Sequence, residues 1–321
     1  MFGNRPGFAS MFRENELTLG LLFPLESYAG PVPRMNVEEQ VTEAMLAEER
    51  GFAALWARDV PLLDPAFGDG GQLFDPWVWL TFIASRTSRI ALATGSTVLP
   101  LRNPIDTAKA AASLDLLCGE RLVLGAATGD RGIEFPAYGL NRDDSGELYR
   151  ASVESIRRLW AEDFPEIDSR YGTLRGADLL PKPRGRRIPL LVTGNSRQDL
   201  PWIAANGDGW LMYPKPVAAQ RQLTTAWREA AGDWKPFSQS LYVDLDADPG
   251  TAPAPIHLGY RTGRNFLVDH IGELRDIGVN HVILNLKYGR RPAPEVLQEL
   301  GEHVVPHFPA HHLAAQPTPA T

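Results

Sequence analysis

Apolar and polar residues alternate along this chain in two patterns that follow one another from end to end. Short continuous apolar runs are typical of buried strands, and longer stretches with apolar residues three or four positions apart are typical of amphipathic helices. Gly, Pro and Asp cluster between the two kinds of segment and mark the turns. The pattern predicts eight strands, at 17–23, 53–57, 90–95, 122–125, 188–192, 209–213, 241–245 and 281–286. Eight helices are predicted at 37–50, 77–86, 105–117, 146–161, 198–206, 218–231, 263–277 and 294–304.

This strict alternation favours an α/β fold in which eight parallel strands close into a (β/α)8 TIM barrel with inserted loops. A doubly wound open sheet is the alternative, but it would need a second domain, and no linker separates one. We therefore expect one domain over 1–321, with the barrel at about 17–308 and a disordered tail at 309–321. Residues 61–74, 162–187 and 247–259 are expected to be loops, some of which could cover a site.

The composition restricts the classes of partner. A formal charge of −7 argues against nucleic acid and against an anionic membrane surface. The chain has a single cysteine, Cys118, which excludes an intrachain disulfide and is expected to be a small buried residue. No stretch of eighteen apolar residues occurs, and the first residues lack the apolar segment of a signal peptide, so a cytoplasmic location is expected.

Small and polar residues follow the predicted strands, where parallel α/β proteins place their sites. Thr94 and Gly95 end the third strand, and Gly129 and Asp130 follow the fourth. Such residues can admit a flat ligand against the backbone, or the glycines can simply close tight turns. Asp59, after the second strand, could accept a hydrogen bond from a ligand, pair with Arg58 or cap the following turn.

A phosphate-binding turn is predicted after the fifth strand. Gly194, Asn195 and Ser196 stand between that strand and the next helix. Glycine allows close approach of a ligand, and the amides of a first helical turn attract anions. Plain helix capping by Asn or Ser explains the same residues equally well. Neither a nucleotide-binding GxxxxGK[ST] loop nor a GxGxxG turn is present.

Protein-based chemistry finds little support in the sequence. The seven histidines form no HExxH pair, and no serine lies in a GxSxG turn. We therefore expect no metal site, and we expect an organic cofactor to carry the reaction.

Several segments together resemble the luciferase-like flavin monooxygenases, a superfamily of (β/α)8 barrels. The resemblance extends over about 17–308. It is carried by TSRIALATGSTVLPLRNPIDTAKAAASLDLLCGERLVLGAATGD, by LLPKPRGRRIPLLVTGNS, by GDGWL, and by LGYRTGRN and GVNHVILNLKYGRRP, which are similar to an uncharacterised subgroup of luciferase-type oxidoreductases.

The resemblance implies a binding site for reduced FMN at the carboxyl-terminal mouth of the barrel. The implied phosphate ligands are Gly194, Asn195 and Ser196. The implied contacts of the flavin ring are Asp59, Thr94, Gly95, Gly129 and Asp130, with a non-proline cis peptide at Thr94–Gly95 or a neighbouring bond. Arg261 and Arg264 are candidates for binding phosphate or an anionic substrate, although solvation of a helix start explains them equally well.

The implied activity is that of an FMN-dependent monooxygenase, in which reduced flavin activates O2 and one oxygen atom passes to a small organic substrate. A separate flavin reductase and a homodimer follow from the same resemblance. Two alternatives remain open: a deazaflavin-dependent dehydrogenase or reductase on the same barrel, and a non-catalytic flavin-binding protein. The chain departs from the family at Asp59-Val60, where many members have Asp/Glu-His, and at Arg102-Asn103-Pro104, where Arg-His-Pro is common. No catalytic residue is assigned.

Overall fold

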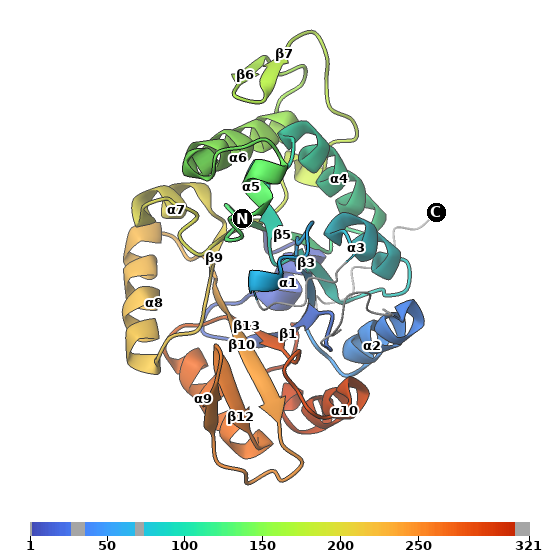
Figure 1. Ribbon diagram of the computed structural model, residues 1–321, viewed down its shortest axis with the longest axis vertical. Helices are drawn as coiled ribbons and strands as arrows, with labels where there is room; N and C mark the ends of the chain where they lie inside the picture. The colour runs from blue at the N-terminus through green and yellow to red at the C-terminus, as the bar shows by residue number, and fades with distance from the viewer. Residues whose placement is uncertain (1, 27–35, 68–73, 312–321) are drawn as a thin grey trace.

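The strands of the computed structural model form a closed parallel barrel inside a ring of helices (Figure 1). The structure describes residues 2–26, 36–67 and 74–311. Around the barrel the strands follow the order β13, β1, β2, β3, β5, β8, β9 and β10, and β10 pairs with β9 on one side and with β13 on the other. The predicted (β/α)8 architecture is confirmed. The barrel strands are β1 (Thr18–Phe23), β2 (Ala54–Ala57), β3 (Ala91–Thr94), β5 (Leu122–Ala127), β8 (Leu190–Thr193), β9 (Gly209–Met212), β10 (Phe237–Leu245) and β13 (His281–Asn285).

The helices pack outside this barrel and begin at residues that suit helix starts. Asn36, Asp75, Asn103 and Asp199 each accept a backbone N–H with the side chain at a helix N-terminus. The surrounding helices are α2 (Val37–Glu49), α3 (Pro76–Ala84), α4 (Pro104–Leu117), α6 (Ser145–Ala161), α7 (Leu200–Asn206), α8 (Val217–Ala231), α9 (Arg264–Asp276) and α10 (Ala293–His303). Within the three described ranges, no helix is long and apolar enough to span a bilayer.

The structure extends the predictions in several places. Strand β10 begins at Phe237, whereas the prediction began at 241. The prediction was short because Ser238 and Gln239 interrupt the apolar pattern, although both side chains are buried in the barrel. Cys118 is buried, as predicted. Short elements not predicted are α1 (Pro6–Met11), β4 (Thr97–Val98), α5 (Glu134–Ala137), β6 (Ile167–Ser169), β7 (Gly172–Leu174), β11 (Ala254–Ile256) and β12 (Gly259–Thr262). Single 3-10 turns lie at Pro65–Phe67, Leu99–Leu101, Arg142–Asp144, Arg184–Arg186 and Val305–His307.

These short elements lie within the three segments expected to be loops or at the ends of the barrel. Strands β6 and β7 form a hairpin within 162–187 that projects away from the barrel (Figure 1). Strand β12 pairs with the second half of β10 and with β11, so 247–259 is partly a β-structure beside the mouth. Residues 68–73 of the first segment and 312–321 of the expected tail lie outside the described residues. His311, assigned to that tail, is buried, and its N–H donates to the carbonyl of Ser10 at 2.9 Å.

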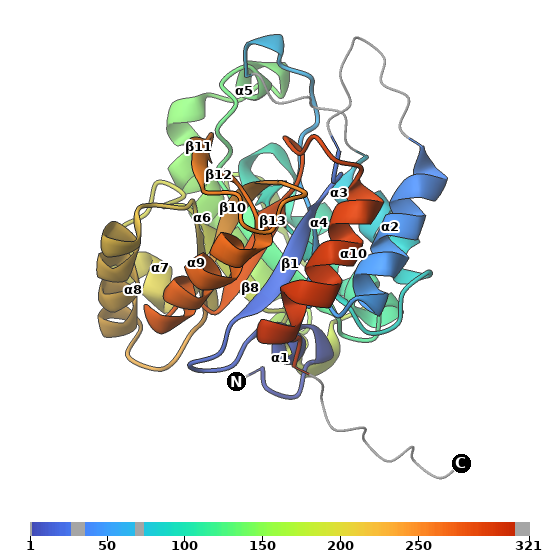
Figure 2. The ribbon, with the colours of Figure 1, turned by 90° about the horizontal axis from the view of Figure 1, so that it is seen from below.

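The inside of the barrel is packed separately from the layer between strands and helices. Trp56 is its largest side chain, and Ala54 on the same strand and Ala91 and Ala93 on β3 leave room for it. Helix α1 closes the amino-terminal end of the barrel, opposite α5 and β11 (Figure 2). Phe8 and Met11 of this helix, with Phe2 and Phe12, belong to the same apolar cluster.

A chain of buried hydrogen bonds joins this closed end to the barrel interior. The indole N–H of Trp56 donates to Nε2 of His281 at 3.0 Å, Nδ1 of His281 lies 2.7 Å from Oγ1 of Thr18, and that hydroxyl donates to the carbonyl of Met11 at 2.8 Å. With Nε2 accepting and the Thr18 hydroxyl donating onward, the proton of His281 belongs on Nδ1. A methyl group at Gly20 would lie 2.6 Å from Nε2 of His281, so this glycine is required for the close packing.

Burial lowers the pKa of His281 to about 3, with a smaller contribution from His311. The imidazole is therefore neutral in the folded protein at neutral pH, whereas in the unfolded chain it takes up a proton near pH 6.5. Between these two values the unfolded state binds more protons, so this histidine makes folding less favourable as the pH falls.

We predict that the free energy of unfolding decreases below pH 6.5, with His281 contributing about 1.4 kcal/mol per pH unit down to about pH 3. Urea unfolding at pH 7, 6 and 5 measures this slope. In His281→Gln the slope should be smaller, whereas His303→Gln, on the exposed side of α10, should leave it unchanged. A His281 imidazole that titrates near pH 6 in a histidine NMR titration of the folded protein would contradict the prediction.

Candidate active site at the barrel mouth

The polar residues predicted after the strands lie together at the end of the barrel opposite α1. In a closed parallel barrel all carboxyl-terminal strand ends meet at one rim. The ends of β2, β3, β5 and β8 are neighbours there, in that order. The structure therefore brings Thr94, Gly95, Gly129 and the 194–196 turn to one side of the mouth.

Hydroxyl groups connect three of these strand ends. Thr94 donates from Oγ1 to the carbonyl of Gly125 at 2.7 Å, and Oγ of Ser96 lies 2.5 Å from Oγ1 of Thr193. The peptide bond Gly95–Ser96 is cis, so the expected non-proline cis peptide after the third barrel strand is confirmed. A methyl group at Gly125 would lie 2.1 Å from the carbonyl oxygen of Thr94. The close approach of β3 to β5 therefore depends on the lack of a side chain at Gly125.

The turn after β8 differs from the predicted helix start. Helix α7 begins at Leu200 with Asp199 as its N-cap, so Asn195 and Ser196 do not cap it, and a carboxylate occupies its N-terminus. Gly194, Ser196 and Arg197 instead have positive φ angles of 57°, 43° and 53°. Backbone amides of such left-handed turns can converge on an anion. A methyl group at Gly194 would meet no atom within 4 Å, so the turn is open at this position.

Side chains beneath this turn hold its shape. The Ser196 hydroxyl donates to the Thr193 carbonyl at 2.8 Å, and Gln198 donates from Nε2 to the carbonyl of Gly146 at 3.0 Å. The phenol of Tyr149 is buried and interacts with Ser196. The N-terminus of α6 therefore packs against the turn. Ser145, the first residue of that helix, has a buried hydroxyl without a hydrogen-bond partner in the described part of the chain.

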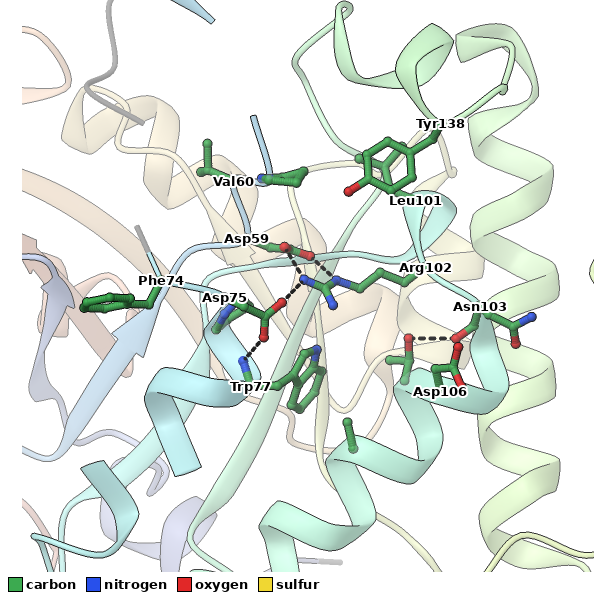
Figure 3. A pocket seen from close by; sticks show the side chains of 14 residues that line it. Asp59, Val60, Phe74, Asp75, Trp77, Leu101, Arg102, Asn103, Asp106 and Tyr138 are labelled. Atoms are coloured by element: carbon green, nitrogen blue, oxygen red, sulfur yellow. Dashed lines mark hydrogen bonds and ion pairs between the residues drawn. The ribbon is translucent and has the colours of Figure 1, made fainter. Parts of the chain in front are cut away.

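Asp59 forms an ion pair with Arg102 (Figure 3). Arg102 donates from Nε and Nη2 to the two oxygens of Asp59, both at 2.7 Å, and from Nη2 to Asp75 at 2.7 Å. The N–H of Val98 also donates to Asp59 at 3.0 Å. The carboxylate therefore joins β2 to β4 and, through Arg102, to the start of α3. Asp130, by contrast, is exposed.

This ion pair borders a cavity with a volume of about 560 Å³. The cavity lies between the loop after β2 and the helices α3 and α4, beside the mouth, and Asn103, Asp106, Trp77 and Tyr138 also line it (Figure 3). The cavity is poorly suited to bind an anion, because three carboxylates, those of Asp59, Asp75 and Asp106, line it together with only one arginine.

Loops after β2 and β5 contact each other at the mouth end of the barrel. The guanidinium of Arg131 lies 4.4 Å from the ring centre of Phe67. The backbone of Leu62 hydrogen-bonds to the buried carboxyl of Glu134, and burial raises the pKa of that carboxyl to about 7.

Arg261 and Arg264 are not brought to the turn after β8. Arg261 lies 3.6 Å from the carboxylate of Asp246, and Arg264 pairs with Glu299 at 2.8 Å. Both guanidinium groups therefore face carboxylates of their own side of the barrel. Their assignment to an anionic ligand, like that of the other site residues, stays a prediction.

Sequence reasoning missed the polar residues on the opposite side of the mouth. Arg58 follows β2, Tyr213 follows β9, and Lys287 and Tyr288 follow β13, while Tyr242 is part of β10. The rule that strand ends face the site would have found four of them. Local motifs did not, because each residue stands in a segment with no recognisable ligand-binding pattern.

Nothing in the described ranges gathers three or more His, Cys, Asp or Glu side chains into a group that could hold a metal ion. The architecture and the rim define a class of protein: a TIM barrel whose strand ends present hydroxyls, glycines and an open turn at the mouth.

The chain belongs to the luciferase-like monooxygenase family, whose sequence profile matches residues 17–239. Members of this family are oxidoreductases, and the chain is one. Solved structures agree in fold. A monooxygenase from Streptomyces bottropensis superimposes with a TM-score of 0.77 at 20% identity, over 91% of this chain and all of that one. An F420-dependent secondary alcohol dehydrogenase gives 0.75 at 18% identity, over 91% and 99%.

Curated relatives share more sequence. An uncharacterised protein of Mycobacterium tuberculosis is 29% identical over 224 residues, which cover 64% of this chain and 78% of the relative. An F420-dependent hydroxymycolic acid dehydrogenase of the same organism is 30% identical over 62% of this chain and 56% of the relative. An F420-dependent glucose-6-phosphate dehydrogenase of Kineococcus radiotolerans is 29% identical over 52% of this chain and 50% of the relative.

We predict that Arg102→Gln destabilises the protein by about 2–4 kcal/mol, because it leaves the buried carboxylate of Asp59 without its guanidinium partner. Arg158→Gln, which removes an exposed ion pair with Glu162 on α6, is the matched control and should leave the stability nearly unchanged. Chemical unfolding measures both. Equal stability of the two variants would contradict a structural role for the Asp59–Arg102 pair.

Proposed function

We propose that this protein is a dehydrogenase or reductase that uses the deazaflavin coenzyme F420 and a small organic substrate. The observation that carries the proposal is the agreement among the relatives with named activities: the hydroxymycolic acid dehydrogenase and the glucose-6-phosphate dehydrogenases are all described as F420-dependent. Structural neighbours of both kinds, monooxygenases and F420-dependent enzymes, share the fold at low identity and do not separate the two. The deazaflavin alternative is thus favoured over the FMN monooxygenase expected first.

The residues at the mouth suit a flavin-like cofactor. Gly194 offers open space at a turn with several left-handed residues, which fits a phosphate group. Thr94, Gly95 and Gly129 present little side-chain bulk at the neighbouring strand ends, which fits a flat ring. A deazaflavin supplies hydride transfer without activating oxygen. The protein's own part is to bind, to orient and to exclude water.

Any proton that the substrate gains or loses must then be exchanged with side chains of the rim. Asp59 is buried and bound by Arg102, so its carboxylate is not available without breaking that pair. Asp130 is exposed at the end of β5 and acts electrostatically on Arg58. Within this proposal O2 and a separate flavin reductase are not needed, while the small organic substrate and the homodimer remain proposals.

The proposal is tested by titrating the purified protein with oxidised F420 and with FMN while following cofactor fluorescence. We expect saturable binding of F420 at concentrations where FMN binds weakly. Preferential binding of FMN, together with oxygen consumption by the protein mixed with reduced FMN, would overturn the proposal in favour of a monooxygenase.

We further predict that Gly194→Ala weakens F420 binding by about tenfold or more, because the methyl group would fill the open position and disfavour the left-handed turn by about 1–2 kcal/mol. Gly119→Ala is the matched control, since that glycine also has a positive φ, 68°, and open space, but follows α4 at the end of the barrel opposite the rim. Both variants should lose similar stability, and only Gly194→Ala should lose affinity. Unchanged affinity would remove the turn from the binding site.

A further inference from the structure

Two basic residues lie on either side of β1 at the mouth. Arg58 directly follows β2, Lys287 follows β13, and both strands pair with β1. In the barrel order, β1 stands four strands from β8 in either direction. Arg58 and Lys287 therefore lie across the mouth from the Gly194 turn.

Lys287 lies beside two stacked tyrosine rings. Its ammonium lies 5.5 Å from the ring centre of Tyr288, and that ring stacks on Tyr242 at 5.3 Å with an interplanar angle of 23°. The backbone N–H of Lys287 donates to Oδ1 of Asn285 at 3.1 Å, and Asn285 stands opposite Tyr242 in the pairing of β13 with β10. The lysine is 5% exposed and also lines a cavity of about 340 Å³ with Arg290 and Arg291.

The two basic side chains are close enough to affect each other. Burial, and next the positive charge of Arg58, lower the pKa of Lys287 to about 7. Arg58 in turn interacts with the phenols of Tyr242, Tyr288 and Tyr213 and with the carboxylate of Asp130, and burial lowers its pKa. Both side chains have further partners in the fold, and together they concentrate positive charge in a partly desolvated part of the mouth.

We propose that Arg58 and Lys287 form a binding site for an anionic group, a carboxylate or a phosphate, on the substrate. A negative oxygen near both side chains would lower the repulsion between them, and the stacked rings of Tyr242 and Tyr288 lie in the same cluster. The assignment to the substrate rests on the proposed function, because the turn at Gly194, on the far side of the mouth, is the one suited to the cofactor's phosphate. The substrate class is thus a small acid or a phosphate ester.

The lysines of this chain make a direct test possible, because there are few of them. They are Lys109, Lys182, Lys215, Lys235 and Lys287. Protein labelled with ¹³C at the lysine ε-carbon gives one NMR signal for each, and Lys287→Arg identifies the signal of Lys287. Each signal is followed against pH in chloride, and then in inorganic phosphate or acetate at the same ionic strength.

We expect the Lys287 signal alone to titrate near neutral pH in chloride, and its midpoint to rise by about one unit or more in saturating phosphate or acetate. The anion that raises the Lys287 midpoint further indicates whether the substrate group is a phosphate or a carboxylate. Arg58→Gln should raise the midpoint in chloride and abolish most of the response to the anion. Arg58→Lys should retain the response, and Arg221→Gln, an exposed residue of α8, should leave both unchanged.

A midpoint of Lys287 that neither anion moves, or an equal shift of all five signals, would overturn the site. Repeating the titration with saturating F420 separates this proposal from that of the function. If F420 binds and phosphate still moves the Lys287 signal, the anion belongs to the substrate. If F420 alone moves the signal and phosphate adds nothing, the site holds the cofactor and the substrate assignment is wrong. If F420 does not bind but phosphate acts, the site stands and the proposed function fails.

Discussion

The hydrogen-bonded chain from Trp56 through His281 and Thr18 to Met11 is the constraint on which the rest of the barrel depends. It places a large indole and a neutral imidazole inside a ring of eight strands, where an unpaired polar atom would be costly. Gly20 leaves the space for both. Because this filled layer and α1 close one end of the barrel, the opposite end is where strand termini can be shaped by small residues without loss of the core.

At the mouth, backbone geometry and side-chain charge are divided between two sides. On the side of β3, β5 and β8, glycines and hydroxyls bring the strand ends close together and leave the turn at Gly194 open. On the side of β2, β10 and β13, basic and phenolic side chains gather. In the proposed function, the first side would bind the cofactor and the second side would bind the anionic group of the substrate.

Asp59 shows how a residue in the expected place can have another role. It follows a barrel strand, as site residues do, yet its carboxylate receives two hydrogen bonds from Arg102 and one from the amide of Val98. The pair ties together the loops after β2 and β3 and borders a cavity outside the barrel. Sequence position indicated the rim correctly, but only the tertiary structure shows that this side chain pairs with Arg102 and so links two loops of the rim.

The sequence by itself determined the barrel, because alternating strand and helix patterns with turn residues between them admit few arrangements of eight units. It also indicated the cis peptide beside Gly95 and the buried Cys118. It did not predict α1, the first half of β10, or the start of α7 at Leu200, where polar residues are buried or a local cap is replaced by tertiary contacts. Only the tertiary structure brought Arg58 and Lys287 to the same part of the mouth. These residues are more than two hundred positions apart, and barrel closure, a long-range property, is what makes them neighbours.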